Sequence, residues 1–258
     1  MSATLFNPAG DEEYRRLRGL EAAYDPSTLR MLDGLGVAPG WRCLEVAAGA
    51  GSIALALQTR AGTVTVVDSS PVYITHLESP AFVVIEAPIE HAELPPERDL
   101  VHARFLLDLV ANPLEVLERL MSCLRPGGWL AIEEFDDFTQ GAAVGTPSGA
   151  DLHTKVLGCK QKAWEKRGLD NYLGRKVPVW FSELGLVEIE NECGCRVRQG
   201  GTPGARLWKQ TVVGMRDALL EAGLAGDDLV DYLSLLESRA FFYFSPLVVR
   251  TWGKVATA

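Results

Sequence analysis

The sequence CLEVAAGAG at residues 43–51 decides the fold of this chain. An apolar strand runs into small residues and then directly into a helix rich in Ala and Leu, expected over residues 51–60. Small residues let the backbone approach a ligand closely, and the first turn of a helix offers N–H groups that have no partner within the helix. Dinucleotide-binding folds hold a pyrophosphate in this way. The stretch therefore predicts a ligand-binding turn between a strand and a helix.

Strands and helices alternate on both sides of this turn, from residue 41 to 135. A further helix is expected over 113–124, with Pro113 in its first turn. Short strands separated by helices imply right-handed crossovers and a parallel sheet, and such a sheet binds its ligand beyond the carboxyl ends of the strands. Strands are expected at 41–47, 63–68, 82–86, 99–104 and 129–135.

The remaining segments are predicted to complete a single domain over residues 1–258, because this length suits one large α/β core. Residues 1–40 form an N-terminal helical cover, in which Asp25-Pro26 predicts the start of a second helix. Residues 41–135 form the ligand-binding core. Residues 136–258 supply a helical lid insertion and the C-terminal part of the sheet. Their expected parts are a mobile loop at 137–150, helices at 151–167, 175–184, 205–222 and 227–237, a strand at 187–197 and an apolar final segment at 241–255.

Composition narrows the kind of ligand. The net charge of −9 disfavours a nucleic-acid partner, which usually requires a basic face. The chain has no apolar run near the roughly 20 residues that span a bilayer, and its first residues do not resemble a secretory signal. Five cysteines, an odd number, suggest reduced thiols and a cytoplasmic protein. Cys193 and Cys195 lack the spacing of a zinc site, so no metal is predicted. A small molecule is the expected ligand, and the oligomeric state stays open, a homodimer included.

Two carboxylates refine this expectation. Glu45 precedes the small-residue turn, where it would repel a pyrophosphate but suit a cation such as an amino-acid ammonium. Asp68 ends the next strand, where a carboxylate can accept hydrogen bonds from both hydroxyls of a ribose. A ribose joined to an amino acid, without phosphate, describes S-adenosylmethionine.

Four segments, at residues 44–51, 66–68, 99–104 and 124–130, resemble class I S-adenosylmethionine-dependent methyltransferases, and most closely the small-molecule branch common in actinobacteria. The resemblance implies a Rossmann-like, doubly wound α/β fold whose seven-stranded sheet is mostly parallel, with an antiparallel last strand. It also implies the cofactor contacts. Glu45 and the backbone of Gly49 and Gly51 would hold the methionine end. The remaining contacts would be Asp68 on the ribose with Ser69 beside it, Ile89 on the adenine and the backbone of Arg104 on the amino group.

The sequence departs from this family at two cofactor positions. Ala47 stands where the family usually has Gly, which adds about 1 kcal/mol of strain if the position requires a positive φ. Pro88 stands where the family tends to have an Asp that accepts from the adenine amino group. Glu86 or Glu90 is the alternative acceptor, and loss of that one hydrogen bond would cost only about 0.5–1.5 kcal/mol.

The acceptor is expected beyond the fourth and fifth strands and under the N-terminal helical segment. A methyl acceptor that carries a proton often needs a general base. His153, which follows the predicted lid loop, is the preferred base, and Asp136 and Asp137 after the fifth strand are equally well placed. The candidate walls of the acceptor pocket are Tyr14, Phe105, Phe135, Phe138 and Trp164.

Three functions therefore compete. The first is methyl transfer to an O, N or C atom of a small molecule, in specialised metabolism. The second is a different reaction on the same fold, such as a cyclisation, which Ala47 and Pro88 motivate. The third is a non-catalytic protein that binds S-adenosylmethionine. A nicotinamide-dependent oxidoreductase is more distant, because Glu45 and the turn at residues 125–128 argue against it.

Overall fold

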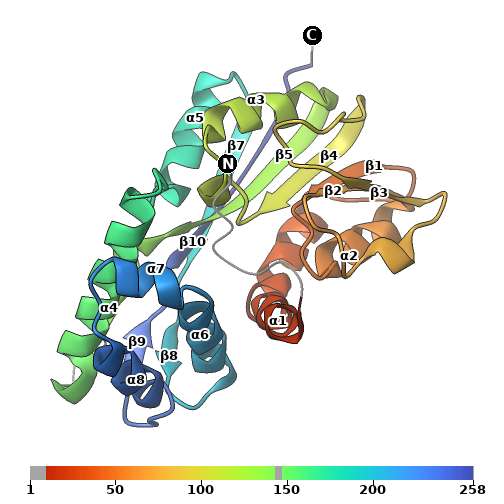
Figure 1. Ribbon diagram of the computed structural model, residues 1–258. Helices are drawn as coiled ribbons and strands as arrows, with labels where there is room; N and C mark the ends of the chain where they lie inside the picture. Colours follow the sequence, from red (N-terminus) through yellow and green to blue (C-terminus); the bar gives the residue numbers. More distant parts are fainter. Residues whose placement is uncertain (1–9, 143–146, 258) are drawn as a thin grey trace.

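The computed structural model describes residues 10–142 and 147–257, and its central element is a seven-stranded sheet (Figure 1). The strand order is β3-β2-β1-β4-β5-β10-β7. The pairs within β3-β2-β1-β4-β5 are parallel, and β10 is antiparallel to both β5 and β7. The strands are β1 (Arg42–Val46), β2 (Thr63–Asp68), β3 (Phe82–Glu86), β4 (Arg98–Arg104), β5 (Leu124–Asp136), β7 (Val187–Gly194) and β10 (Leu247–Lys254). The predicted Rossmann-like sheet with its antiparallel last strand is confirmed.

Helices cover both faces of this sheet (Figure 1). On one face, α1 (Asp11–Gly34) and α2 (Ser52–Ala61) bury Leu32 and Leu57 against Val64 and Leu100. On the other face, α3 (Pro113–Ser122) and α5 (Val177–Glu183) pack on Val46, Val101 and Ile132 in a second apolar core. The strands between the two cores are buried on both faces, which explains why they read as almost continuous apolar runs.

One prediction for the N-terminal segment is wrong. Asp25-Pro26 does not start a new helix, because α1 continues through Pro26 as a single helix of 24 residues. Proline in a helix interior removes a hydrogen bond and costs about 3 kcal/mol. Tyr24 and Thr28, one turn apart on either side of Pro26, are both buried. Packing of one continuous face against the sheet therefore overrides the local preference.

The C-terminal half adds a smaller unit beside the sheet (Figure 1). The helices α4 (Pro147–Glu165), α6 (Pro203–Gly214), α7 (Arg216–Glu221) and α8 (Gly226–Leu235) share their own apolar core. A three-stranded sheet in the order β6-β9-β8 accompanies them, formed by β6 (Gly141–Ala142), β8 (Val197–Gln199) and β9 (Phe242–Phe244). The final apolar segment is thus divided between two sheets, β9 in the small one and β10 in the large one, and does not complete the large sheet alone.

The segment at 137–150, predicted to be a mobile loop, contains regular structure where it is described. It starts with the short helix η3 (Asp137–Thr139) and strand β6, and α4 begins at Pro147; residues 143–146 lie outside the described residues. The other short helices are η1 (Thr75–Leu77), η2 (Leu107–Leu109) and η4 (Gly174–Lys176). Within the described ranges, every helix is too short or too polar to cross a membrane. In the same ranges, no three His, Cys, Asp or Glu side chains are grouped to hold a metal ion.

Candidate active site

A cavity of about 600 Å³ opens at the carboxyl ends of the parallel strands. Its wall takes residues from all three predicted segments: Leu17 and Tyr24 of α1, Gly49 and Asp68 of the core, and Lys160 of α4. The volume lies within the usual range of small-molecule sites. The fold therefore closes one cavity with elements that are far apart in the sequence.

The small-residue turn forms one end of this cavity. Ala47, Ala48, Gly49 and Ala50 line it. Ala47 has φ 58° and Gly49 has φ 58°, a region that favours glycine. Ala47 therefore has the positive φ for which backbone strain was predicted. Gly51 also has a positive φ, 93°, but it does not line the cavity: a Cβ there would lie 2.5 Å from Cγ2 of Ile74. The glycine at position 51 serves packing.

Asp68 closes the same end of the cavity from the tip of β2. Its Oδ2 accepts the N–H of Gly49 at 3.3 Å, and its Oδ1 accepts the N–H of Ser70 at 2.8 Å. Burial raises the pKa of Asp68, and these two backbone N–H groups act against that rise. Ser69 lines the cavity beside it. The carboxylate is thus fixed to the cofactor turn while it faces the cavity.

The N-terminus of α2 is occupied by a carboxylate of the protein itself. The N–H of Ser52 donates to Oε1 of Glu21 at 3.1 Å, and Glu21 is buried on α1 and lines the cavity. A helix N-terminus that binds pyrophosphate must leave these N–H groups free for phosphate oxygens. A negative charge at this place repels phosphate, so the turn fits a nucleoside without phosphate.

Glu45 does not line the cavity, and the structure gives its carboxylate another partner. Its Oε2 lies 2.7 Å from Nδ1 of His102 on the neighbouring strand β4, and both side chains are buried. The expected contact with a ligand ammonium is therefore replaced by a contact inside the sheet. Glu45 and His102 are paired in register on β1 and β4, so their side chains project from the same face of the sheet.

The adenine end of the predicted site contains the second sequence departure. Pro88, Ile89 and Glu90 line the cavity, whereas Glu86 does not. Of the two alternative acceptors for the adenine amino group, only Glu90 therefore reaches the wall. Ile89 is 4% exposed and joins the core under α3.

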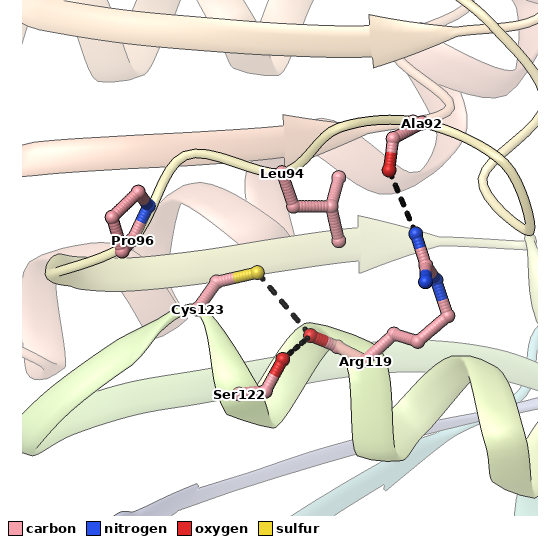
Figure 2. A pocket seen from close by; sticks show the side chains of 6 residues that line it. All are labelled: Ala92, Leu94, Pro96, Arg119, Ser122 and Cys123. Carbon is pink, nitrogen blue, oxygen red and sulfur yellow. Dashed lines mark hydrogen bonds between the residues drawn. The ribbon is translucent and has the colours of Figure 1, made fainter.

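Arg119 of α3 holds this segment from behind. Its Nη2 donates to the carbonyl of Ala92 at 2.7 Å, and its Nε donates to the carbonyl of Ile89 at 3.3 Å. Figure 2 shows the side chain reaching from α3 to the carbonyl of Ala92. A small hollow of about 260 Å³ lies beside it. Cys123 and Ser122 in that hollow donate to the carbonyl of Arg119. The hollow thus lies behind the segment from Pro88 to Ala92, and the side chain of Arg119 holds that segment to α3.

Aromatic side chains line the middle of the cavity. Phe105, the residue after β4, stacks on Phe135 of β5 with ring centroids 3.8 Å apart and planes at 6°. Tyr24 of α1 meets both rings edge to face. Phe105 has φ 56°, a rare conformation for an aromatic residue that typically marks a functional site. Arg104 lines the cavity beside them, and its guanidinium is held by Asp25 and Thr28.

The far wall is built by the C-terminal half. Lys160 of α4 donates to Oδ2 of Asp137 at 2.6 Å, and its ammonium lies over the rings of Trp164 and Trp208. Arg198 of β8 also lines the cavity, near Tyr24, where it helps to offset the burial that raises the pKa of that phenol. This wall offers flat apolar surface together with charged groups, as expected for an aromatic or heteroatom-bearing acceptor.

Asp108 stands on the wall between these two ends. It belongs to η2, directly after β4. Its Oδ1 is buried and, among the described residues, has no hydrogen-bond partner. Burial raises the pKa of Asp108 to about 7; the positive charge of Lys160 acts against this rise and the negative charge of Asp137 adds to it.

Four residues predicted for the acceptor side lie off the cavity wall. Tyr14 is 42% exposed and packs on Tyr73, and Phe138 is 72% exposed under the guanidinium of Arg175. Asp136 binds that guanidinium with both carboxylate oxygens, at 2.7 Å each. Burial would raise the pKa of Asp136, but Arg175 and the N–H of Phe138 lower it.

His153, the fourth of these residues, sits in the separate core of the C-terminal unit. It is 1% exposed, and its Nδ1 lies 2.6 Å from the hydroxyl of Tyr232. Burial lowers the pKa of His153 to about 4. The interpretation of His153 and Asp136 as bases therefore finds no support in the geometry, because both side chains lie off the cavity wall. Nε2 of His153 has no hydrogen-bond partner among the described residues, but it is buried in the core of the C-terminal unit.

Sequence reasoning missed several wall residues. Asp108 follows β4 in an apolar run, so the one acid in the sequence LLDLV at 106–110 is a signal that could have found it. Lys160, Trp208, Arg198 and Tyr243 carry no comparable signal, since each belongs to an ordinary-looking helix or strand of the C-terminal half.

The fold and the phosphate-excluding turn together define a class I S-adenosylmethionine-dependent methyltransferase. The family model described as a methyltransferase domain matches residues 12–199, and the chain belongs to this family. Its cofactor is S-adenosylmethionine, for which Asp68, the 47–50 turn and the 88–90 segment provide a suitable lining. Comparison of the sequence with curated proteins finds no significant match.

Solved structures share the fold at low sequence identity. The YcgJ protein of Bacillus subtilis is 13% identical, with a TM-score of 0.61 over 91% of this chain and 100% of that chain. Phosphoethanolamine N-methyltransferase 2 of Haemonchus contortus, solved with phosphomonomethylethanolamine and S-adenosylhomocysteine, is 13% identical with a TM-score of 0.56. The alignment covers 90% of this chain and 53% of that enzyme, so the chain spans about half the length of the relative.

Proposed function

We propose that this methyltransferase transfers a methyl group to an O, N or C atom of a small molecule in specialised metabolism. The observation that carries the proposal is the continuity of one cavity of about 600 Å³ from Asp68 to the wall of Lys160, Trp164 and Trp208. Bound S-adenosylmethionine supplies an electrophilic methyl group. The protein supplies position, which accounts for much of the rate of such transfers.

One end of the cavity would bind the cofactor, and the other end would bind the acceptor. Asp68 and Ser69 would hold the ribose, Ile89 would pack on the adenine, and the turn at 47–50 would hold the methionine end. Phe105 and Trp164 would flank the acceptor. We further propose that residues 1–258 act as a single domain, because the acceptor wall consists of elements outside the 41–135 core.

Two measurements test this proposal. Calorimetric titration with S-adenosylhomocysteine should show binding at a single site. Incubation with S-adenosylmethionine and a library of phenols, carboxylic acids and amines should yield products that are heavier by one methyl group. Binding without any product would favour a non-catalytic protein, and a product of unchanged mass would favour a different reaction such as a cyclisation.

A further inference from the structure

We propose that Asp108 is the general base that removes the proton of the acceptor during methyl transfer. This inference rests on the proposed function and assigns the one role that the predicted bases, His153 and Asp136, do not fill. Three features of the structure support it: an unpartnered oxygen of Asp108, a turn fixed by hydrogen bonds that carries this residue, and the charged groups around its carboxyl.

The first feature is the buried Oδ1 of Asp108, which has no hydrogen-bond partner among the described residues. Two other carboxylates on the cavity wall are engaged: Asp68 accepts two backbone N–H groups and Asp137 accepts from Lys160. An unpartnered buried acceptor costs free energy that a ligand donor can recover. An acceptor hydroxyl or amine supplies the donor that this oxygen lacks.

The second feature is the set of hydrogen bonds that fixes the turn carrying Asp108. Glu134 is fully buried in β5, and its Oε1 accepts the N–H groups of Leu106 and Leu107 at 2.9 and 2.7 Å. These bonds fix the turn that carries Asp108. Burial together with the nearby Asp108 raises the pKa of Glu134 well above its usual value. A fixed turn holds the Asp108 carboxyl in place for proton transfer.

The third feature is the set of charges around Asp108. Lys160 of α4, Asp137 of η3, Arg16 of α1 and Glu134 of β5 are its charged neighbours. Lys160 and Asp137 belong to the acceptor wall and not to the cofactor turn. With burial as the largest cause, this environment gives Asp108 a pKa of about 7. A base whose pKa lies near neutrality combines a useful ionised fraction with adequate basicity.

The proposed proton transfer is balanced. Oδ1 of Asp108 takes the proton of the acceptor O–H or N–H as the acceptor lone pair forms the bond to the methyl carbon. The electron pair of the breaking carbon–sulfur bond stays on sulfur, which becomes neutral. Asp108 then returns its proton to water after product release, which restores the carboxylate.

The kinetic test compares Asp108→Asn with the wild type on an acceptor identified by the library screen. We expect kcat to fall about 100- to 10,000-fold, with calorimetric affinity for S-adenosylhomocysteine unchanged within twofold. The kcat of the wild type should rise with pH through about 7, and the residual kcat of the variant should not. Asp151→Asn, an exposed acid on α4, is the matched control and should keep the wild-type profile.

A second measurement needs no acceptor. The carboxyl carbon-13 resonance of Asp108, assigned by its loss in Asp108→Asn, should titrate near pH 7 in wild-type protein saturated with S-adenosylhomocysteine. Titration below pH 5, a variant whose kcat stays within threefold of the wild type, or a loss of S-adenosylhomocysteine affinity in the variant would each overturn the proposal. A wild-type protein that methylates nothing in the library refutes the proposed function instead, and the carbon-13 titration then still decides whether Asp108 is a poised carboxyl.

Discussion

Oε2 of Glu45 lies 2.7 Å from Nδ1 of His102, and both side chains are buried beneath the cofactor turn. Nε2 of His102 lies 3.3 Å from Oε1 of Glu133, whose Oε2 meets Nε of Arg250 at 2.8 Å. With His102 protonated, two carboxylates face two cations, so the row is neutral. A buried ionic row survives only when each charge is paired, and this one crosses β1, β4, β5 and β10.

This row predicts that stability falls in mildly alkaline solution. Burial alone would lower the pKa of His102, but Glu45 and Glu133 outweigh it and raise the pKa to about 9, against 6.5 for an unperturbed histidine. A raised pKa adds stability that is complete below about pH 6.5 and is lost as the pH rises through about 9. Urea unfolding of the wild type should therefore lose about 3 kcal/mol across that window.

His102→Gln provides the comparison. It leaves two buried carboxylates without their shared cation, so its free energy of unfolding should already be about 3–5 kcal/mol lower at pH 6.5. Its further loss between pH 6.5 and 9.5 should be small. A variant that follows the same pH slope as the wild type would show that another group titrates.

Ala47→Gly should stabilise the protein. Ala47 has φ 58°, and its N–H is fixed by the carbonyl of Val67 at 2.9 Å, so the backbone cannot relax. Removal of the Cβ relieves about 1–2 kcal/mol of strain, and the added chain entropy of glycine offsets about 0.5–1 kcal/mol of that gain. Tm should therefore rise by about 1–4 °C. Ala48→Gly is the control: Ala48 has no positive φ, and the added chain entropy should lower Tm. Equal shifts in the two variants would contradict the assigned strain.

Asp68→Ala should weaken S-adenosylhomocysteine binding about 10- to 100-fold, because a charged hydrogen bond contributes about 1.5–3 kcal/mol. Isothermal titration calorimetry measures the change directly. Glu86→Ala is matched to it: Glu86 pairs in register with Asp68 at the end of β3 but is exposed and lies off the cavity wall. Unchanged affinity in Asp68→Ala, or equal loss in both variants, would remove Asp68 from the proposed site.

The cofactor half of the molecule could be predicted because its information is local. The residues of the turn at 47–51, of β2 up to Asp68 and of the 88–90 segment are close in sequence, and each lies at the end of a strand whose apolar run is plain. Parallel pairing then brings the strand ends together without further information. The side chain of Glu45 could not be predicted, since its direction depends on His102 of the neighbouring strand.

The acceptor half could not be predicted for the opposite reason. Lys160, Trp208 and Arg198 meet only because α4, α6 and β8 pack around a core of their own, and no periodicity in the sequence sets that packing. The position of the Phe138 side chain could not be predicted either, although it depends on neighbouring residues in the sequence. Asp136 turns toward Arg175 and accepts the N–H of Phe138, which leaves that ring outside the cavity.

His153→Ala should cost stability and leave catalysis intact. The imidazole contacts the hydroxyl of Tyr232 and packs on the rings of Tyr232, Phe241 and Tyr243, with centroids 5.3 to 5.7 Å away. Truncation of a buried side chain of this size costs about 2–5 kcal/mol. Because the pKa of His153 is lowered to about 4, its neutral form contributes stability above pH 6.5 that is lost as the pH falls through 4. Urea unfolding should show both effects, with His153→Gln intermediate. A variant that turns over at least 100-fold more slowly, while its S-adenosylhomocysteine affinity is unchanged, would instead restore His153 as a base and would place the acceptor in the C-terminal unit.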